Sequence, residues 1–197
     1  MSLMEYVSTK PDGAGKYHGA VAQGYDTKRE HDDKWKIEQR IIEDMLDFPA
    51  DTVVLDVPCG TGRFFECYAK RRFNVVGVDI SDEMLNEAVK KIKKYELTFR
   101  SIRLGVGDVR KLQFDDKTVD VAVMCRLTRW LSPEDCKTAF KELQRVSRKR
   151  IIFTARVRNH PHARTYELIK SALNGWKIAR DEPGVDLDYR IIALEPV

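Results

Sequence analysis

Three short segments of the sequence carry residue types that suit the binding of one ligand. The first is the run Asp56-Val57-Pro58-Cys59-Gly60-Thr61-Gly62, in which an apolar segment passes into two closely spaced glycines. The second is Asp79, which ends an apolar run, and the third is Gly107-Asp108-Val109, which follows another. Glycines after a strand let the backbone approach a ligand at a helix N-terminus. An acid after the next strand can accept hydrogen bonds from both ribose hydroxyls, and a third carboxylate can accept from an adenine amino group.

Each segment also has a purely structural explanation. Two glycines between a strand and a helix can form an ordinary turn, and Asp79, just before Ser81, can help to cap the next helix. Asp108 can be a plain turn aspartate. The three segments follow successive predicted strands, however, and the carboxyl ends of parallel strands meet at the edge where such sheets bind ligands. Their agreement predicts an adenosine-containing cofactor.

The glycine turn narrows the choice of cofactor. A dinucleotide site of the G-x-G-x-x-G type needs a third glycine to seat a pyrophosphate, and Phe65 stands at that position. A phosphate-binding G-K-[ST] motif does not occur in the sequence. A cofactor that contains adenosine without phosphate fits best.

The hydrophobic pattern supplies the elements that must position these residues. A helix is predicted from Asp33, with Ile37, Ile41, Ile42, Met45 and Leu46 on its apolar face, and it ends at Pro49-Ala50-Asp51. Strands are predicted over Thr52–Val57, Asn74–Asp79, Phe99–Val106, Val119–Cys125, Arg150–Val157, Trp176–Arg180 and Leu187–Leu194. Helices are predicted over Gly62–Arg71, after Ser81, after Ser132, and from Pro161 to about Leu173, and a turn is predicted at Glu182-Pro183-Gly184.

This alternation predicts an α/β fold with a doubly wound, mostly parallel seven-stranded sheet, helices on both faces, and a terminal antiparallel hairpin. The 197 residues suit a single domain, in which residues 1–50 form an arm and helix that act as a lid and residues 51–197 form the cofactor-binding core.

Several of these segments together resemble the class I, Rossmann-like S-adenosylmethionine-dependent methyltransferases. Val54–Phe64 resembles motif I of that family, and Val76–Leu85 resembles its ribose-binding segment. Gly107–Phe114 with Val119–Val123 resembles the third and fourth motifs, and Phe140–Val146 resembles the helix before the fifth strand. Two features depart from the pattern: Pro58 stands where many relatives have the first glycine, and no proline-glycine-glycine turn precedes Arg150.

The resemblance implies S-adenosyl-L-methionine as cofactor and S-adenosyl-L-homocysteine as product. Asp56, Cys59 and the two glycines would line the methionine and ribose portion, and Asp79 would hold the ribose hydroxyls. The implied cofactor-binding residues are Asp56, Pro58, Cys59, Gly60, Gly62, Asp79, Ile80, Met84, Asp108, Val109, Cys125, Arg126 and Tyr25. Of these, Ile80 would flank adenine, Asp108 and Val109 would contact its edge, and Cys125 with Arg126 would form a floor under the methyl group.

The reaction class is easier to read than the acceptor. Methyl transfer from a sulfonium needs mainly an aligned nucleophile, so a general base is not obligatory and none is identified beyond the candidates Tyr25 and Arg126. The segment Cys125-Arg126-Leu127-Thr128 carries neither the Asn/Asp-Pro-Pro-aromatic motif nor the Pro-Cys nucleophile of base methyltransferases. Tyr25-Asp26 resembles a pair that relatives place in the lid, although Tyr25 can equally pack the arm against the domain.

Cationic residues follow the fourth and fifth strands. They suggest an acceptor with a carboxylate or phosphate group bound by arginines, although a solvated rim explains them as well. The candidate substrate residues are Tyr17, Arg129, Arg156 and Arg158.

Composition limits the remaining functions. The net charge of +4 permits an anionic partner without demanding nucleic acid. The four cysteines and four histidines show no zinc spacing, so no metal is expected, and the dispersed thiols suit the cytoplasm. No apolar run is long enough to span a membrane, and residues 1–15 carry no secretory signal.

We therefore expect a methyltransferase that acts on an N or O nucleophile of a small, possibly anionic molecule. The alternatives are an RNA or macromolecule methyltransferase, a non-catalytic cofactor-binding partner subunit and, more distantly, a nicotinamide oxidoreductase. The oligomeric state is not predicted.

Overall fold

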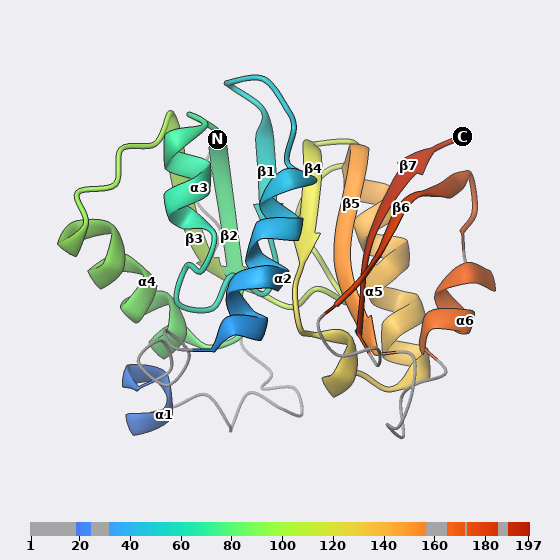
Figure 1. Cartoon of the computed structure of the whole chain (residues 1–197), viewed down its shortest axis with the longest axis horizontal. Coiled ribbons are helices and arrows are strands. Elements are labelled where there is room, and N and C mark those ends of the chain that lie inside the picture. Colours follow the sequence, from blue (N-terminus) through green and yellow to red (C-terminus); the bar gives the residue numbers. More distant parts are fainter. Residues whose placement is uncertain (1–18, 25–31, 157–164, 172, 185–188) are drawn as a thin grey trace.

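A computed structural model describes residues 19–24, 32–156, 165–171, 173–184 and 189–197 of the chain. Its centre is a seven-stranded sheet of order β3-β2-β1-β4-β5-β7-β6 (Figure 1). The strands are β1 (Val53–Asp56), β2 (Asn74–Asp79), β3 (Ser101–Val106), β4 (Val119–Met124), β5 (Ser147–Arg156), β6 (Trp176–Pro183) and β7 (Tyr189–Pro196). The first five pair in parallel, whereas β7 lies between β5 and β6 and is antiparallel to both.

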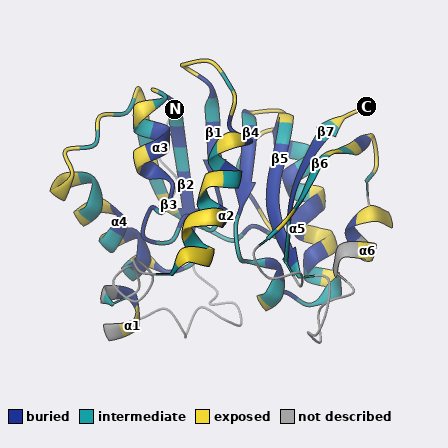
Figure 2. Ribbon diagram, in the orientation of Figure 1, coloured by how far each residue is buried: buried dark blue, intermediate teal, exposed yellow. Residues whose placement is uncertain are grey.

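Helices cover both faces of the sheet (Figure 1). They are α1 (Ala20–Gln23), α2 (Asp33–Asp44), α3 (Phe65–Lys70), α4 (Asp82–Lys94), α5 (Pro133–Val146) and α6 (Thr165–Ser171), with a 3-10 turn at Thr128–Trp130. Neighbouring strand residues point to opposite faces, because Val54 packs with α2, α3 and α4 while Leu55 packs with α5. Strands β1 and β4 and the middle of β5 and β7 are therefore buried on both sides, whereas the edge strands β3 and β6 are partly exposed (Figure 2).

The predicted fold class is confirmed, with differences at several element ends. The first crossover helix begins at Phe65 rather than Gly62, because Gly60 and Gly62 adopt φ values of +54° and +77°, which a helix does not allow. The fifth strand begins at Ser147, directly after α5, and not at Arg150. The third begins at Ser101 rather than Phe99, and Cys125 lies just beyond β4.

The C-terminal hairpin also differs from expectation. Its predicted turn at Glu182-Pro183-Gly184 is wrong in part, because β6 continues through Pro183, which pairs with Arg190. A proline is tolerated there because β6 is an edge strand of the sheet. The next residue, Gly184, donates its N–H to the carbonyl of Tyr189. The expected helix from Pro161 is described only over Thr165–Ser171, and the expected strand start at Leu187 lies outside the described residues.

Helix α2 differs from prediction at one position that matters for the site. Ile37, expected on the buried face, is 41% exposed, whereas Glu38 is only 5% exposed. Ile42, Met45 and Leu46 are fully buried, as expected. The helix is therefore turned so that an acid, and not an isoleucine, faces the domain.

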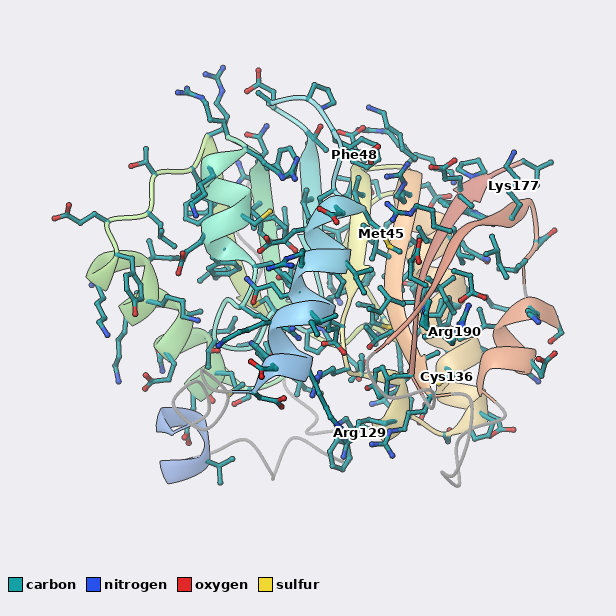
Figure 3. The ribbon with its side chains drawn as sticks, viewed as in Figure 1. Met45, Phe48, Arg129, Cys136, Lys177 and Arg190 are labelled. Carbon is teal, nitrogen blue, oxygen red and sulfur yellow. The ribbon has the colours of Figure 1, made fainter. Side chains whose placement is uncertain are left out.

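The C-terminal end of α2 is anchored to the sheet by Arg150. Its guanidinium donates to the carbonyl of Met45 at 2.6 Å and to Glu195 at 2.9 Å, and it stacks over the ring of Phe48. Met45 and Phe48 lie beside this end of α2 (Figure 3). Residues far apart in the sequence thus hold α2 on one face of the sheet.

Candidate active site

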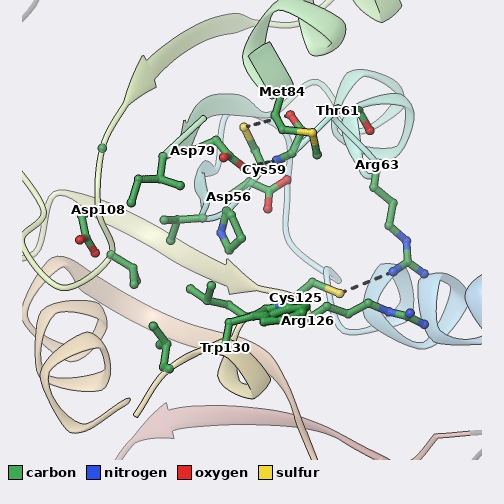
Figure 4. Close-up of a pocket in the computed structure, with 18 of the residues that line it drawn as sticks. Asp56, Cys59, Thr61, Arg63, Asp79, Met84, Asp108, Cys125, Arg126 and Trp130 are labelled. Atoms are coloured by element: carbon green, nitrogen blue, oxygen red, sulfur yellow. Dashed lines mark hydrogen bonds between the residues drawn. The ribbon is translucent and has the colours of Figure 1, made fainter. Parts of the chain in front are cut away.

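A pocket opens at the carboxyl edge of β1, β2 and β4 (Figure 4). The predicted site residues that line it are Asp56, Pro58, Cys59, Gly60, Asp79, Ile80, Met84, Asp108, Val109, Cys125, Arg126 and Arg129. Residues that were not assigned a binding role from the sequence also line it: Trp35, Val57, Thr61, Arg63, Phe64, Gly107, Arg110, Leu127, Trp130 and Leu131. The fold therefore brings the three proposed cofactor segments to one cavity.

The first turn of the pocket is tied to the neighbouring strand. The N–H of Cys59 donates to the carbonyl of Val78 at 2.9 Å, and the Val57–Pro58 peptide is cis. A Cβ at Gly60 would lie 3.3 Å from the terminal methyl of Met84, so the backbone there closely approaches a pocket-lining side chain. Pro58 itself is half-buried and lines the pocket.

Gly62, predicted to line the cofactor site, is not among the residues that line the pocket. A Cβ at this position would lie 2.4 Å from the ring of Phe65, and the residue is buried with a left-handed backbone. The glycine is needed so that Phe65 can pack under the turn. Phe65, which stands at the third glycine position of the G-x-G-x-x-G pattern, therefore explains why residue 62 is a glycine.

Asp79 holds two pocket segments at once. It is 6% exposed, and its two carboxylate oxygens accept from the N–H groups of Gly60 at 2.8 Å and Ser81 at 2.9 Å. Burial raises the pKa of its carboxyl group, while these backbone hydrogen bonds lower it. Asp79 can cap the next helix and also bind ribose, because each carboxylate oxygen keeps a second lone pair for a ribose hydroxyl.

Asp56 contributes a buried carboxylate oxygen without a hydrogen-bond partner. The residue is 1% exposed, and its Oδ2 has no hydrogen-bond partner among the described residues. Burial raises the pKa of this carboxyl group well above its usual range; the negative charge of Asp79 adds to this, while the nearby Tyr68 hydroxyl and Arg63 oppose it. The Tyr68 hydroxyl lies beside Asp56 but makes no hydrogen bond of ordinary geometry. An unpaired carboxylate oxygen in a pocket wall is suited to a cationic group such as an ammonium.

Asp108 is clamped by an arginine that the sequence analysis did not single out. Arg110 donates to its carboxylate from Nε at 3.0 Å and from Nη2 at 2.6 Å, and it reaches Asp135 at 3.0 Å. The clamp fixes the orientation of the carboxylate at the pocket wall. A basic residue two positions after the acid was the available signal in the sequence.

A buried ionic cluster forms the wall between α2 and β4. Glu38 accepts from Arg63 and from Arg126, and the thiol of Cys125 lies 3.4 Å from the same carboxylate oxygen. The pKa of the Cys125 thiol is raised by burial first and by the charge of Glu38 next, so the thiol stays protonated and is a poor nucleophile. The signal for this cluster was an acid within the apolar stripe of a helix.

The far side of the pocket combines cationic and apolar groups. Arg126 and Arg129 line it together with Leu127, Trp130 and Leu131. Within the part of the chain that the structure describes, the buried Nε of Arg129 has no hydrogen-bond partner. Residues of both kinds would contact an acceptor that enters beside the cofactor.

Of the other substrate candidates, only Arg156 lies within the described residues. Arg156 is half-buried, is not among the pocket-lining residues, and stacks over the ring of Tyr189 at 5.7 Å. Tyr17, Tyr25 and Arg158 lie outside the described residues. Within the described ranges, no group of three or more His, Cys, Asp or Glu side chains is arranged to hold a metal ion, and no helix is long and apolar enough to cross a membrane.

The fold and the pocket define a class of protein. A mostly parallel sheet with an antiparallel β7, a glycine turn after β1 and an acid after β2 form a Rossmann-like domain that binds an adenosine cofactor. Residues 54–150 match the family model described as "Methyltransferase domain". Residues 54–150 are therefore a methyltransferase domain of the class I, S-adenosylmethionine-dependent kind, and the family and cofactor inferred from the sequence motifs are confirmed.

Curated relatives agree with this assignment. The chain is 33% identical over 104 residues to a demethylmenaquinone methyltransferase of Lactobacillus johnsonii, covering 51% of this chain and 41% of that protein. It is 25% identical over 146 residues to a malonyl-[acyl-carrier protein] O-methyltransferase of Hamiltonella defensa, covering 73% of this chain and 49% of that protein. The chain thus spans less than half the length of these relatives.

Solved structures share the fold. The magnesium protoporphyrin IX methyltransferase of Synechocystis PCC 6803 with bound S-adenosylhomocysteine superposes with a TM-score of 0.72 at 18% identity, covering 92% of this chain and 97% of that one. The PH0226 protein of Pyrococcus horikoshii OT3 gives a TM-score of 0.70 at 21% identity, covering 86% and 92%.

Proposed function

We propose that this chain transfers a methyl group from S-adenosylmethionine to an N or O nucleophile of a small molecule that carries an anionic group. The observation that carries the cofactor part is the unpaired Oδ2 of Asp56, buried in a pocket wall beside Asp79. A cofactor with an ammonium and a ribose offers both groups that these acids need.

The pocket residues divide the binding of the cofactor among them. Asp56 would accept from the α-ammonium, and Asp79 would accept from the ribose hydroxyls while it keeps its bonds to Gly60 and Ser81. Ile80 and Val109 line the pocket next to Asp108, where they would flank the adenine ring. The bound cofactor supplies a methyl group on a positively charged sulfur, which a nucleophile displaces in line.

The chain's part in the chemistry is to hold the acceptor in line with that methyl group and to exclude water. The Cys125 thiol, whose pKa is raised by burial, does not supply a thiolate for a covalent intermediate. The acceptor's own N or O atom forms the new bond, and its proton leaves to solvent or to a neighbouring base. No protein base is assigned among the described residues.

The acceptor part of the proposal is supported by the far wall of the pocket. Arg129, whose Nε has no partner among the described residues, would bind a carboxylate or phosphate, with Arg126 beside it keeping its pair with Glu38. Leu127 and Trp130 would contact an apolar body. The relatives named for demethylmenaquinone and for the malonyl group of an acyl-carrier protein point to small acceptor groups. An RNA acceptor has less support, because Arg63 and Arg110 at the pocket are paired with Glu38 and Asp108.

The lid is also a proposal. Trp35 of α2 lines the pocket, and α1 packs near α4 through a bond from the Gly19 N–H to Glu83. We therefore propose that the segment around α1 and α2 covers the cofactor, as predicted for residues 1–50.

Calorimetry tests cofactor binding, and a methyl-transfer assay tests the acceptor class and the catalytic activity. We expect the purified chain to bind S-adenosylhomocysteine at micromolar concentration and not to bind a nicotinamide dinucleotide. No binding of S-adenosylhomocysteine would overturn the proposal. Methyl transfer from radiolabelled cofactor is then measured with small carboxylic acids, phenols and amines, with total RNA in parallel. Transfer by the chain alone would exclude a non-catalytic partner subunit.

Substitution separates the acceptor site from the cofactor site. We expect Arg129→Gln to raise the KM of an anionic acceptor about tenfold, the usual effect of one lost charge-assisted contact, and to leave S-adenosylhomocysteine affinity unchanged. Arg103→Gln on exposed β3 is the matched control. An unchanged acceptor KM in Arg129→Gln and Arg126→Gln would refute the anionic acceptor.

A further inference from the structure

Glu38 is a buried acid outside the segment that matches the family model. Its side chain is 6% exposed and lies on α2, whereas the match begins at residue 54. Burying a carboxylate is costly unless it is paired and hydrogen-bonded. A buried acid at this position therefore calls for a specific set of partners.

The partners of Glu38 come from two different walls of the pocket. Its Oε1 accepts from Nε of Arg126 at 2.8 Å, just after β4, and from Nη1 of Arg63 at 2.5 Å, just after the glycine turn. The Sγ of Cys125 lies 3.4 Å from the same oxygen. One carboxylate thus joins α2, the glycine turn and the end of β4.

Trp35, one turn earlier on α2, is held by the same two arginines. The guanidinium carbon of Arg63 lies 3.5 Å from the centre of its ring, and that of Arg126 lies 4.9 Å away. Arg63 also donates to the carbonyl oxygen of Trp35. The wall that α2 presents to the pocket is therefore an aromatic ring in contact with two cations.

The backbone conformation of Arg126 directs its side chain toward Glu38. This residue adopts a left-handed conformation with φ of +58°, which is uncommon for a residue with a side chain. Its N–H donates to Oγ1 of Thr154 at 2.7 Å, which holds this conformation against β5. The side chain is directed from the pocket floor toward α2 (Figure 4).

From this geometry we infer that Glu38 is a positioning residue, whose negative charge keeps Arg63, Arg126 and Trp35 in place around the cofactor and acceptor. Two guanidinium groups share one carboxylate, so removing that carboxylate leaves a buried cation, Arg63, beside a partly buried one, Arg126, without the charge that neutralises them. The inference rests on the proposed function, because the placement of these groups matters for activity only if the pocket binds the cofactor.

Docking of α2 alone does not require Glu38. The C-terminal half of the helix is already held by fully buried Ile42 and Met45 and by the contacts of Arg150. Glu38 lies in the half next to the pocket. A role limited to holding the helix would therefore affect stability without affecting ligand affinity.

The test compares Glu38→Gln with Glu43→Gln, the same change elsewhere on α2, where the side chain contacts Gln39. We expect Glu38→Gln to weaken S-adenosylhomocysteine binding about tenfold by calorimetry and to shift the ¹⁹F resonance of 5-fluorotryptophan at Trp35, identified by its loss in Trp35→Phe. Glu43→Gln should change neither. A folded Glu38→Gln with wild-type affinity and an unshifted resonance would overturn the inference.

If Glu38→Gln does not fold, Glu38→Asp tests whether the negative charge at this position supports ligand binding. It keeps the charge but shortens the side chain by one methylene group, so it should restore folding and recover affinity to within about threefold of the wild type. A folded Glu38→Asp that keeps the charge but binds S-adenosylhomocysteine at least tenfold more weakly than the wild type would overturn the inference. If the wild type itself fails to bind S-adenosylhomocysteine, the proposed function fails, and the Trp35 resonance still tests the role of Glu38.

Discussion

The carboxylate of Asp79 accepts a hydrogen bond from the backbone N–H of Gly60, with 2.8 Å between Oδ2 and N. The end of β2 is thereby fastened to the glycine turn that follows β1. The same carboxylate accepts from Ser81, which caps α4 through its own hydroxyl. One side chain thus orders three of the segments that form the pocket.

Asp79→Asn should therefore weaken cofactor binding more than the loss of one contact would suggest. An amide keeps one acceptor oxygen, so either Gly60 or Ser81 loses its partner together with the charge. We expect the Kd for S-adenosylhomocysteine to rise roughly 10–100-fold, from the usual worth of hydrogen bonds to charged groups. Calorimetry measures it, with exposed Asp82→Asn as control. Equal affinities in both variants would contradict the role of Asp79.

Gly62→Ala tests the packing explanation of the second glycine. Its Cβ would lie 2.4 Å from the ring of Phe65, and the backbone has a φ of +77°. We expect a loss of roughly 1–3 kcal/mol in the free energy of unfolding, typical of overpacking. Urea denaturation measures this loss. Gly105→Ala, where an added Cβ meets nothing within 4 Å, should cost much less. Similar losses in the two variants would show that Phe65 does not impose the glycine.

Asp56 should make the ligand-free protein less stable as the pH rises. Burial raises its folded-state pKa well above the ordinary 3.8, so the folded state holds a proton that the unfolded state releases. Stability then falls with rising pH between the unfolded and folded pKa values. The free-energy difference between wild type and Asp56→Asn should change in this direction from about pH 4 upward, as measured by denaturation at several pH values. A pH-independent difference would contradict it.

Cofactor binding should release a proton from Asp56. An ammonium placed against its unpaired oxygen favours the charged carboxylate, so binding lowers the pKa that burial has raised. Calorimetry with S-adenosylhomocysteine in two buffers of different ionisation enthalpy counts the protons released. We expect release in the wild type below the ligand-free pKa of Asp56 and a clear reduction in Asp56→Asn. Equal proton counts would place the ammonium elsewhere.

The order of elements and the cofactor class were readable from the sequence because both depend on local patterns. Asn74–Asp79 is the predicted second strand to the residue, since a buried β-branched run and a following cap mark both of its ends. Element ends set by tertiary contacts were less readable. β6 continues past the predicted turn at Pro183 because β7 pairs with it there.

Some residues of the candidate site could be predicted from the sequence, and others could not. The amino-acid sequence by itself determined the glycine turn, the acids Asp56, Asp79 and Asp108, and the family to which they belong, because turns and strand ends are encoded by short motifs. Only the tertiary structure placed Glu38 between Arg63 and Arg126 and turned Ile37 out to solvent. The hydrophobic period of α2 favours the opposite rotation, and two arginines distant in sequence outweigh it by neutralising a buried charge.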